Sequence, residues 1–267
     1  MDFFQAIILG IIEGLTEFLP VSSTAHLMIA SKLLGVPDSD FLKTFEIVIQ
    51  LGAIFAVLFL YFKKIFDFKL IKNLFFGFLP AAVLGFVFYP LFRSLLERID
   101  LALLALFFGG IVLIVFEEFF PARGGSVSGG KEKDGSTSLT TSESLDEKKS
   151  FVIGLWQSLA MIPGVSRSLA TIFGGLAQGL SKKNAVEFSF LLALPTMFFA
   201  SGYDLFKNYS SMDFSNWQNL ALGFFVSFLS AVLSVKLFLK FLEKNNFQAF
   251  GWYRIIFSLA VFGLLFI

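Results

Sequence analysis

The chain has 267 residues, of which 56% are hydrophobic and only 15% are charged, and its mean hydropathy is +0.80. Soluble domains carry about 25% charged residues, so this composition excludes an ordinary soluble protein and indicates an integral α-helical protein of the lipid bilayer. Twenty-one basic and twenty acidic residues give a net charge of +1, so we expect no nucleic-acid partner. The absence of cysteine excludes disulfides, thiolate nucleophiles and cysteine metal sites.

The apolar regions predict the membrane topology. The N-terminus has neither a basic stretch nor a small-residue cleavage site, so we do not expect a cleaved signal there. A helix needs roughly 20 apolar residues to cross the hydrocarbon core. Six segments meet this length, namely 43–61, 73–92, 99–120, 184–206, 216–240 and 249–267.

Two further apolar regions are interrupted by proline and polar residues. Region 3–35 is broken at Pro20–Thr24, and region 151–180 is broken at Pro163–Ser168. Each predicts two helices of about 12–17 residues joined by an irregular turn, entering and leaving the membrane on the same side. We therefore expect two re-entrant helix–turn–helix elements.

A weak internal repeat relates the two halves of the chain. At a fixed offset of 144 residues, Gly10 falls on Gly154 and Ser22 on Ser166. The Gly/Ser/Thr/Lys/Glu-rich tract 121–150 is expected to be a disordered hydrophilic loop between them. The prediction is an all-α membrane protein with six transmembrane helices plus two re-entrant elements in inverted-topology repeats. One membrane domain, 1–267, then comprises repeat half 1 (1–120), the cytoplasmic loop and repeat half 2 (151–267).

The distribution of lysine and arginine predicts the orientation. If the first interrupted region enters from outside, thirteen basic residues lie inside and five lie outside, in agreement with the positive-inside rule. Both chain ends and the first interrupted region then face outward. The second interrupted region enters from the inside.

The first interrupted region carries two carboxylates on one helix face. Glu13 and Glu17 are four residues apart. Placing an ionised residue at membrane depth costs at least ~2.5 kcal/mol of free energy, so a pair of carboxylates there needs an interaction that offsets this cost. They are either solvated at the membrane surface, or they share a divalent cation or hold a proton. Oxygen ligands suit Mg²⁺ or Ca²⁺, and a single histidine without cysteine makes zinc a poor fit.

Hydroxyl groups and the only histidine follow the break at Pro20. Ser22, Ser23 and Thr24 stand where the next helix begins, where such residues serve either as N-caps or as part of a phosphate site. His26 is expected to face the same pocket, as a catalytic group rather than a core residue.

The second interrupted region supplies a fixed cation. Arg167 stays charged at any working pH, and its donors match phosphate oxygens; Ser166 and Ser168 flank it. The alternative is a purely structural ion pair with Glu13 or Glu17. Together the two regions offer the parts of a phosphoryl-transfer site.

Two residues elsewhere are weaker candidates for substrate contact. Thr171 lies on the helix after Arg167, where it either lines the pocket or bonds back to the backbone. Arg254 in the last span is expected to add a second cation to the pocket, or to pair with Glu243 or Glu46.

The two motifs resemble those of the undecaprenyl-diphosphate phosphatases of the bacitracin-resistance type. The matching stretches are Glu13–Glu17, Pro20–Leu27 and Pro163–Ser168, and Phe45–Ile54 and Phe188–Pro195 look like further family stretches. The similarity thus spans both halves. Ala25 departs from the glycine that the family usually has there, and the tract 121–150 lies outside the match.

The resemblance implies a hydrolase that removes the terminal phosphate of C55-isoprenyl diphosphate, giving the carrier lipid of peptidoglycan synthesis. It further implies resistance to bacitracin, Mg²⁺ or Ca²⁺ dependence, and a site at the outer face of a bacterial inner membrane. On the matched positions, Glu17, Ser23, His26 and Arg167 carry catalysis, and Glu13, Ser22 and Thr24 support it.

Three questions stay open at this point. Ser23 with His26 as base, or His26 itself, could attack the phosphorus, with Glu17 orienting His26 or holding the metal. A lipid transporter or flippase is the rival function, because inverted repeats with broken helices are typical of transporters. The oligomeric state is also open, with a homodimer as one possibility.

Overall fold

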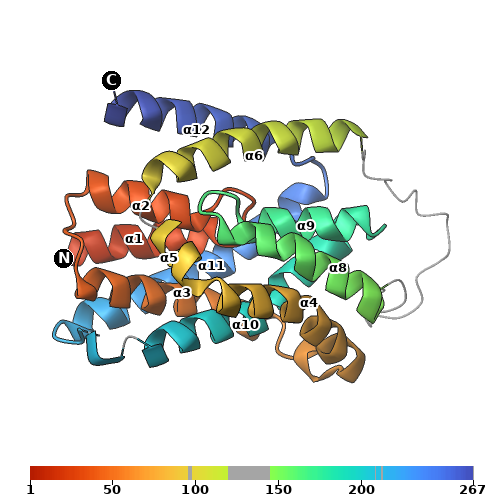
Figure 1. Ribbon diagram of the computed structural model, residues 1–267, viewed down its shortest axis with the longest axis horizontal. Helices are drawn as coiled ribbons and strands as arrows, with labels where there is room; N and C mark the ends of the chain where they lie inside the picture. The colour runs from red at the N-terminus through yellow and green to blue at the C-terminus, as the bar shows by residue number, and fades with distance from the viewer. Residues whose placement is uncertain (96–97, 120–144, 208, 212, 267) are drawn as a thin grey trace.

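Figure 1 shows a computed structural model of the chain, which describes residues 1–95, 98–119, 145–207, 209–211 and 213–266. The described residues form helices joined by short connections. The helices are α1 (Phe3–Thr16), α2 (Ser23–Leu33), α3 (Asp40–Leu60), α4 (Phe68–Val87), α5 (Tyr89–Leu95), α6 (Ile99–Phe119), α8 (Glu147–Ser158), α9 (Arg167–Ala177), α10 (Lys182–Lys207), α11 (Trp217–Leu242) and α12 (Gln248–Phe266). Three 3₁₀ turns accompany them, η1 (Lys64–Phe66), η2 (Leu159–Met161) and η3 (Tyr209–Ser211).

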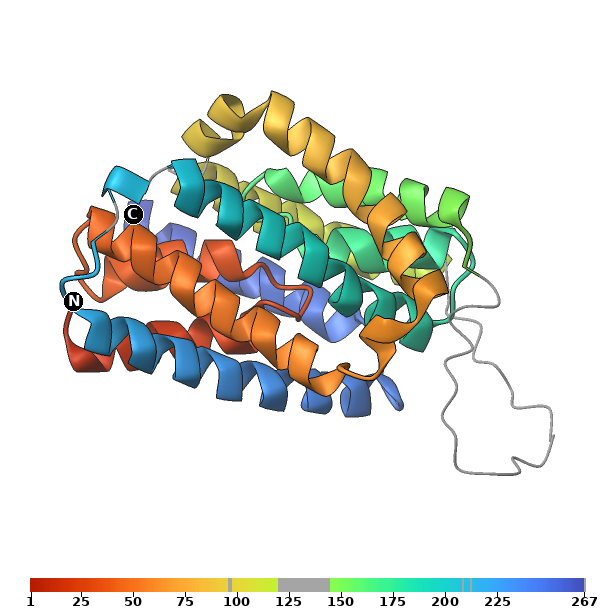
Figure 2. The same cartoon turned by 90° about the horizontal axis from the view of Figure 1, so that it is seen from below.

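Six of the described helices are long and apolar enough to cross a membrane, which confirms the predicted number. They are α3, α4, α6, α10, α11 and α12. The protein is therefore a multi-pass membrane protein. Figure 2 shows α11, α3 and α10 side by side on the face opposite α6 and α12.

The second predicted span, 73–92, was misplaced by several residues. The side chain of Asp67 accepts hydrogen bonds from the backbone N–H groups of Lys69 and Leu70, so α4 begins at Phe68. Phe88 ends it, and a separate helix, α5, follows with Pro90 in its first turn, where the missing N–H costs no hydrogen bond.

The expected loop 121–150 falls mostly outside the described residues, which omit 120–144. Its last residues are helical rather than irregular. Asp146 caps α8 by accepting a hydrogen bond of 2.8 Å from the backbone N–H of Lys149. The second half of the chain therefore begins a few residues earlier than predicted.

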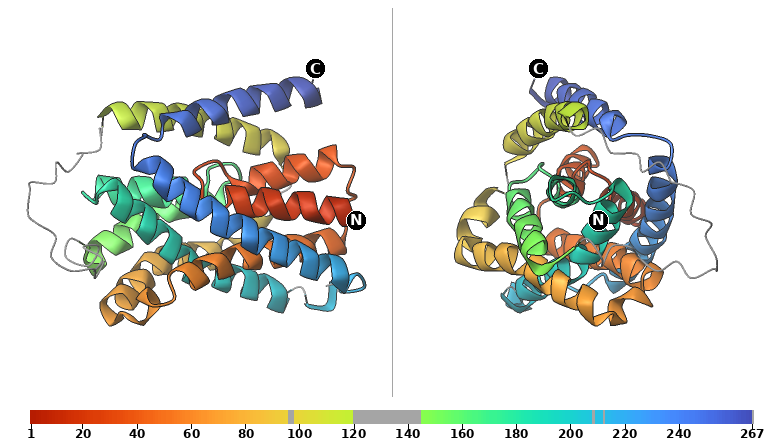
Figure 3. Two further views of the ribbon diagram at one scale, coloured as in Figure 1. Left: turned by 180° about the vertical axis from the view of Figure 1, so that it is seen from behind. Right: turned by 90° about the vertical axis from the view of Figure 1, so that its right-hand side faces the viewer.

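The two interrupted regions form helix–turn–helix elements that we call the first hairpin (α1–α2) and the second hairpin (α8–α9). In Figure 1 they run toward each other from opposite ends of the molecule, so that their turns meet near its middle. Viewed along the long axis in Figure 3, α1, α2 and α9 lie toward the centre, and the long helices surround them. Re-entry of these hairpins into a bilayer stays a prediction.

Both turns share an unusual backbone conformation. Among the described residues other than glycine, only Ser22 and Ser166 have a positive φ, of 71° and 78°. Each is the N-cap residue of the second helix of its hairpin, and the two are 144 residues apart. Such conformations cost of order 1–3 kcal/mol each, so the surrounding structure holds them in place.

Close helix crossings also repeat in the two halves. A methyl group on Gly10 of α1 would lie 2.9 Å from the carbonyl oxygen of Gly223 on α11, and one on Gly154 of α8 would collide with the carbonyl oxygen of Gly77 on α4. Each hairpin thus packs its first helix against a span of the other half. This exchange is what inverted repeats produce.

Helices α6 and α12 cross closely at two glycines. A methyl group on Gly110 would lie 2.7 Å from the carbonyl oxygen of Gly251, and one on Gly251 would lie 2.9 Å from that of Gly110. Each glycine thus lets the backbone of the other helix approach closely, and the symmetry of the two halves stays a prediction.

Candidate active site

Glu17, Ser23 and Arg167 meet where the turns of the two hairpins face each other. The hydroxyl of Ser23 donates a very short hydrogen bond to Glu17 Oε2. Arg167 Nη2 donates to Glu17 Oε1 over 3.1 Å, so one carboxylate joins a nucleophile candidate to a cation. The Glu17 and Ser23 residues are only 6% and 7% exposed, so these interactions are little screened by water.

The position of Glu17 follows from the way α1 ends. Glu17 is the C-cap residue of α1, and residues 17–21 form the turn before Ser22. The positive φ of Ser22 turns the chain back, so that Ser23, six residues away in the sequence, reaches the Glu17 carboxylate. The strained turn therefore brings the base and the hydroxyl together.

Arg167 is held on two sides. Its Nη1 donates to the carbonyl oxygen of Ser189 on α10 over 2.9 Å, and its guanidinium lies 5.8 Å from the centre of the Phe18 ring. Its Nε is buried without a hydrogen-bond partner. Buried donors are almost always paired, so this N–H is available to a bound acceptor such as a phosphate oxygen.

Glu13 lies one helical turn before Glu17 and is 1% exposed. Its Oε1 is buried without a hydrogen-bond partner, and Glu17, Glu46 and Arg167 are its charged neighbours. An unpaired buried carboxylate oxygen beside two further carboxylates is an environment that a cation would stabilise.

The residues present fit an oxygen-ligated divalent cation. Glu13 and Glu17 are both carboxylates, as Mg²⁺ and Ca²⁺ require, and Mg²⁺ in particular is often held by one or two carboxylates together with substrate phosphates. The described residues contain no cluster of three or more His, Cys, Asp or Glu side chains able to hold a metal without such help. Glu13 Oε1 is the atom with free capacity.

His26 has partners other than those expected. Its Nδ1 lies 2.7 Å from the carbonyl oxygen of Ser22, and its Nε2 lies 2.7 Å from the hydroxyl of Tyr253 on α12. The ring stacks on Phe257 with centroids 4.4 Å apart. Glu17 bonds to Ser23 and Arg167 instead, so the predicted orientation of His26 by Glu17 is not what the structure has.

The serines of the second hairpin bind the two turns to each other. The Ser168 hydroxyl donates to the carbonyl oxygen of Leu19 in the first turn over 2.7 Å, and it lies 3.0 Å from the Ser166 hydroxyl. Ser166 also accepts a hydrogen bond from the backbone N–H of Leu169 as an N-cap. Both hydroxyls therefore have structural partners already.

Thr171 takes the second of the two roles considered for it. Fully buried, it donates back to the carbonyl oxygen of Arg167 over 2.9 Å, and its hydroxyl lies 2.6 Å from that of Ser189. In the first hairpin, the Ser22 side chain makes no capping hydrogen bond, and Thr24 is half-buried at the start of α2.

Arg254 does not face a pocket and pairs with neither Glu243 nor Glu46. It is fully buried, and its Nε, Nη1 and Nη2 atoms donate only to backbone carbonyl oxygens. The five acceptors are Pro20 at 3.0 Å, Ala105 at 3.0 Å, Leu106 at 3.2 Å, Gly164 at 2.8 Å and Val165 at 3.3 Å. A guanidinium has five N–H groups, so none is left for a phosphate. In this structure Arg254 ties both turns to α6, and its contact with substrate stays a prediction.

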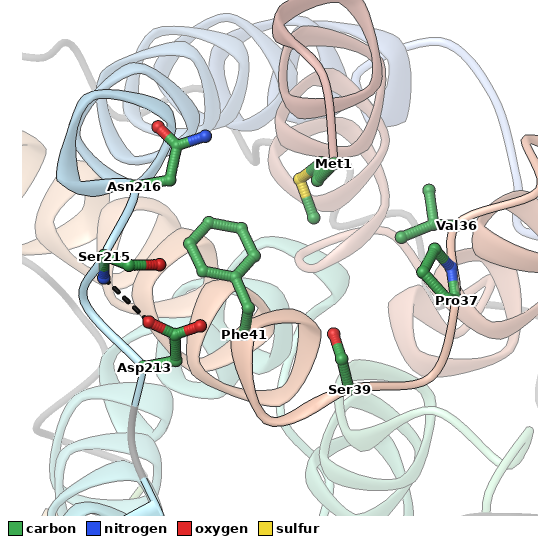
Figure 4. A pocket seen from close by; sticks show the side chains of 8 residues that line it. All are labelled: Met1, Val36, Pro37, Ser39, Phe41, Asp213, Ser215 and Asn216. Carbon is green, nitrogen blue, oxygen red and sulfur yellow. Dashed lines mark hydrogen bonds between the residues drawn. The ribbon is translucent and has the colours of Figure 1, made fainter.

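A separate cavity of about 250 Å³ lies at one end of the bundle, between the N-terminus and the segments 36–41 and 213–216. Figure 4 shows its polar side chains, including Asp213, which accepts a hydrogen bond from the backbone N–H of Ser215. None of the predicted site residues lines it, so we do not assign the chemistry there.

Two contributors were missed from the sequence. Tyr253 contacts His26 from the last helix, and Ser189 supplies a carbonyl oxygen to Arg167. Ser189 lies within the stretch 188–195 that was noted only for its resemblance. Tyr253 precedes Arg254, and a polar pair inside an apolar span was the signal available for it.

Comparison with known proteins gives a consistent family. Residues 6–260 match the family described as bacitracin resistance protein BacA. A protein of Sulfurihydrogenibium sp. named undecaprenyl-diphosphatase is 46% identical over 262 residues, which cover 98% of this chain and 99% of that protein. Proteins with the same name from Wolinella succinogenes and Aquifex aeolicus are 49% and 44% identical, over 96% and 97% of this chain and 95% and 97% of their own lengths.

Proposed function

The chain belongs to the bacitracin resistance protein BacA family, and we propose that it hydrolyses undecaprenyl diphosphate to undecaprenyl phosphate and inorganic phosphate. The observation that carries this proposal is the contact of Glu17 with both Ser23 and Arg167. It combines a hydroxyl, a base and an anion-binding cation at the meeting point of two hairpins inside a membrane protein. The names of the relatives favour this activity over the transporter alternative.

In the proposed mechanism Ser23 is the nucleophile and Glu17 its general base. Ser23 Oγ attacks the terminal phosphorus while its proton passes to Glu17 Oε2, the atom to which it already donates. The bond from that phosphorus to the bridging oxygen breaks, and undecaprenyl phosphate leaves. Water then cleaves the phosphoserine, which releases inorganic phosphate and restores Ser23.

Arg167 acts on the charge of the substrate. Its unpaired Nε–H and its guanidinium charge stabilise the phosphoryl oxygens as the bond to the leaving group breaks. Glu13 and Glu17 would hold Mg²⁺ or Ca²⁺, which when bound would neutralise charge on the diphosphate. The Glu17 carboxylate already contacts Arg167. A bound diphosphate would compete with Glu17 for the Arg167 guanidinium, and this would free Glu17 to accept the proton.

The setting of this reaction follows from the topology predicted above. The site opens to the outer side of a bacterial inner membrane, and the substrate is a polyprenyl diphosphate lipid within that membrane. Activity there supplies carrier lipid for peptidoglycan synthesis and gives resistance to bacitracin. The absence of a nucleic-acid partner and the homodimer as one possible assembly stay predictions.

The test is phosphate release from a C55 or C15 prenyl diphosphate by purified protein, with Mg²⁺, with Ca²⁺ and with chelator. We expect turnover that needs the metal, and a loss of about 10²–10⁴-fold in Glu17→Gln, which keeps the shape of the side chain but cannot accept the proton. Glu118→Gln is the matched control, since Glu118 is exposed at the end of α6. Inactivity of the wild type with every metal would contradict the proposal and make lipid transport the leading alternative.

A further inference from the structure

We propose that Tyr253 is a positioning residue that holds the His26 imidazole in place, by donating a hydrogen bond to Nε2 of the Nδ1–H tautomer that the Ser22 carbonyl selects. The part of this inference that concerns activity rests on the proposed function, and the part that concerns the tautomer does not. Tyr253 lies on α12, far in sequence from both hairpins, and has no role in the mechanism described above.

The hydrogen-bond partners of His26 determine its tautomer. Nδ1 lies 2.7 Å from the carbonyl oxygen of Ser22, and because a carbonyl can only accept, the proton must be on Nδ1. In a neutral imidazole the other nitrogen is then an acceptor. Nε2 lies 2.7 Å from the Tyr253 hydroxyl, which can donate to it. The phenol is therefore complementary to this tautomer, because it can donate to the nitrogen that carries no proton.

Ring stacking holds the imidazole in the plane that these two hydrogen bonds need. The His26 ring is nearly parallel to Phe257, with an interplanar angle of 6°, and to Tyr253, with an angle of 9°. Rotation of the ring by half a turn would place carbon atoms against the Ser22 carbonyl and the Tyr253 hydroxyl. Both partners would then lose this hydrogen bond, at a cost of about 1–3 kcal/mol for the buried Ser22 carbonyl.

Tyr253 also controls what reaches Nε2. His26 is 7% exposed and Tyr253 is 43% exposed, so the phenol stands between the buried nitrogen and the surface of the molecule. Among the residues that the structure describes, Tyr253 is the hydrogen-bond partner of Nε2, and Glu17 is engaged elsewhere. In serine hydrolases a carboxylate commonly orients the histidine; here a backbone carbonyl and a phenol do so.

The single histidine of the chain makes this inference directly measurable. Protein labelled with ¹⁵N-histidine and purified in detergent or nanodiscs gives the two ring nitrogen signals of His26 alone. We expect a protonated Nδ1 and an unprotonated Nε2 in the wild type. In Tyr253→Phe, which keeps the ring stack and removes only the hydroxyl, we expect Nδ1 to stay protonated against the Ser22 carbonyl and the Nε2 signal to move, because Nε2 loses its hydrogen-bond donor. Tyr209→Phe, at an exposed tyrosine, is the control and should leave both signals unchanged.

A kinetic measurement separates positioning from loss of folding. We expect Tyr253→Phe to lower kcat by about 10- to 100-fold with little change in KM, because His26 is itself predicted to act in catalysis and would be misplaced while substrate contacts remain. A proton on Nε2 in the wild type, or unchanged ring signals in Tyr253→Phe, would overturn the proposal. The nitrogen signals need no substrate, so an inactive wild type would refute the proposed function and leave the tautomer assignment testable.

Discussion

The first hairpin carries Glu17 and Ser23, whereas the second carries Met161 and Arg167 at the positions 144 residues later. Both hairpins use a serine with positive φ to start their second helix. The repeated backbone thus presents two turns to each other, and the unlike side chains on them supply a carboxylate and hydroxyl from one side and a cation from the other. The features that the two hairpins share position the site, and the side chains in which they differ supply its chemical groups.

The helices α6 and α12 give a second instance. Their contact pairs Gly110 with Gly251, and Leu113 and Arg254 lie three residues further along each helix. Both side chains are fully buried. Leu113 belongs to the apolar core, while Arg254 donates to carbonyl oxygens of both turns and of α6. One repeat therefore provides a hydrogen-bonded brace that the other lacks.

The largest effect should come from the equivalent positions Ser23 and Arg167. We expect Ser23→Ala to lower the rate of phosphate release by at least ~10³-fold, because the proposed nucleophile is lost. Arg167→Lys should also lower the rate of phosphate release steeply, since lysine cannot reproduce the guanidinium fork that contacts Glu17 and the Ser189 carbonyl. The measurement is phosphate release, together with trapping of a phosphorylated protein by denaturation in acid and, in a separate sample, in base.

The stability of the trapped phosphorylated residue in acid and in base distinguishes the two candidate nucleophiles, Ser23 and His26. A phosphoserine survives acid and is lost in base, whereas a phosphohistidine shows the reverse stability. A trapped adduct on Ser23 that is absent in Ser23→Ala would support the mechanism. A base-stable adduct in Ser23→Ala would instead assign the attack to His26 and contradict the role given to Ser23.

Replacing Arg254 should test the brace. Arg254→Met leaves five buried carbonyl oxygens without their donors, and we expect a loss of about 3–5 kcal/mol in stability, with unfolding about 10 °C lower in detergent. Leu113→Met, at an equally buried position beside the same helix crossing, is the matched control and should cost less than ~1.5 kcal/mol. Equal melting temperatures for the two variants would show that the brace contributes no stability.

Several features of the site were predictable because polar residues are costly in a membrane. Glu17, Ser23 and Arg167 were identified from polar residues beside breaks in apolar segments, and the structure brings them into contact. The ion pair of Glu17 with Arg167 was one of the alternatives considered, but its contact with Ser23 was not predictable, because that contact depends on the backbone turn at Ser22 rather than on spacing along a helix.

Arg254 shows a different limit of sequence reasoning. A buried arginine needs acceptors, but the sequence cannot show whether they are phosphate oxygens or the free carbonyls of two broken helices. The second case applies here because both turns leave carbonyl oxygens unpaired near α12. Tyr253 could not be identified from the sequence for a related reason. Tyrosine is common in membrane spans, and only the fold brings it to His26.

The smallest effect should distinguish Glu13 from Gln157, its counterpart 144 residues later. Each is buried with one polar atom unpaired, Glu13 Oε1 and Gln157 Nε2, but only the carboxylate can attract a cation. We expect Glu13→Gln to raise the Mg²⁺ or Ca²⁺ concentration for half-maximal activity by about 10- to 100-fold, and to weaken cation binding in calorimetry. Gln157→Glu should leave the metal dependence unchanged, and thermal unfolding would check that this variant folds. Gln157 accepts a hydrogen bond from Thr196 on α10 and takes no part in the Glu17–Ser23 contact. If both variants changed the metal dependence equally, the cation would be responding to buried charge in general. If only Glu13→Gln does, the cation belongs to the first hairpin, and the two repeats divide the work between a metal-binding half and an anion-binding half.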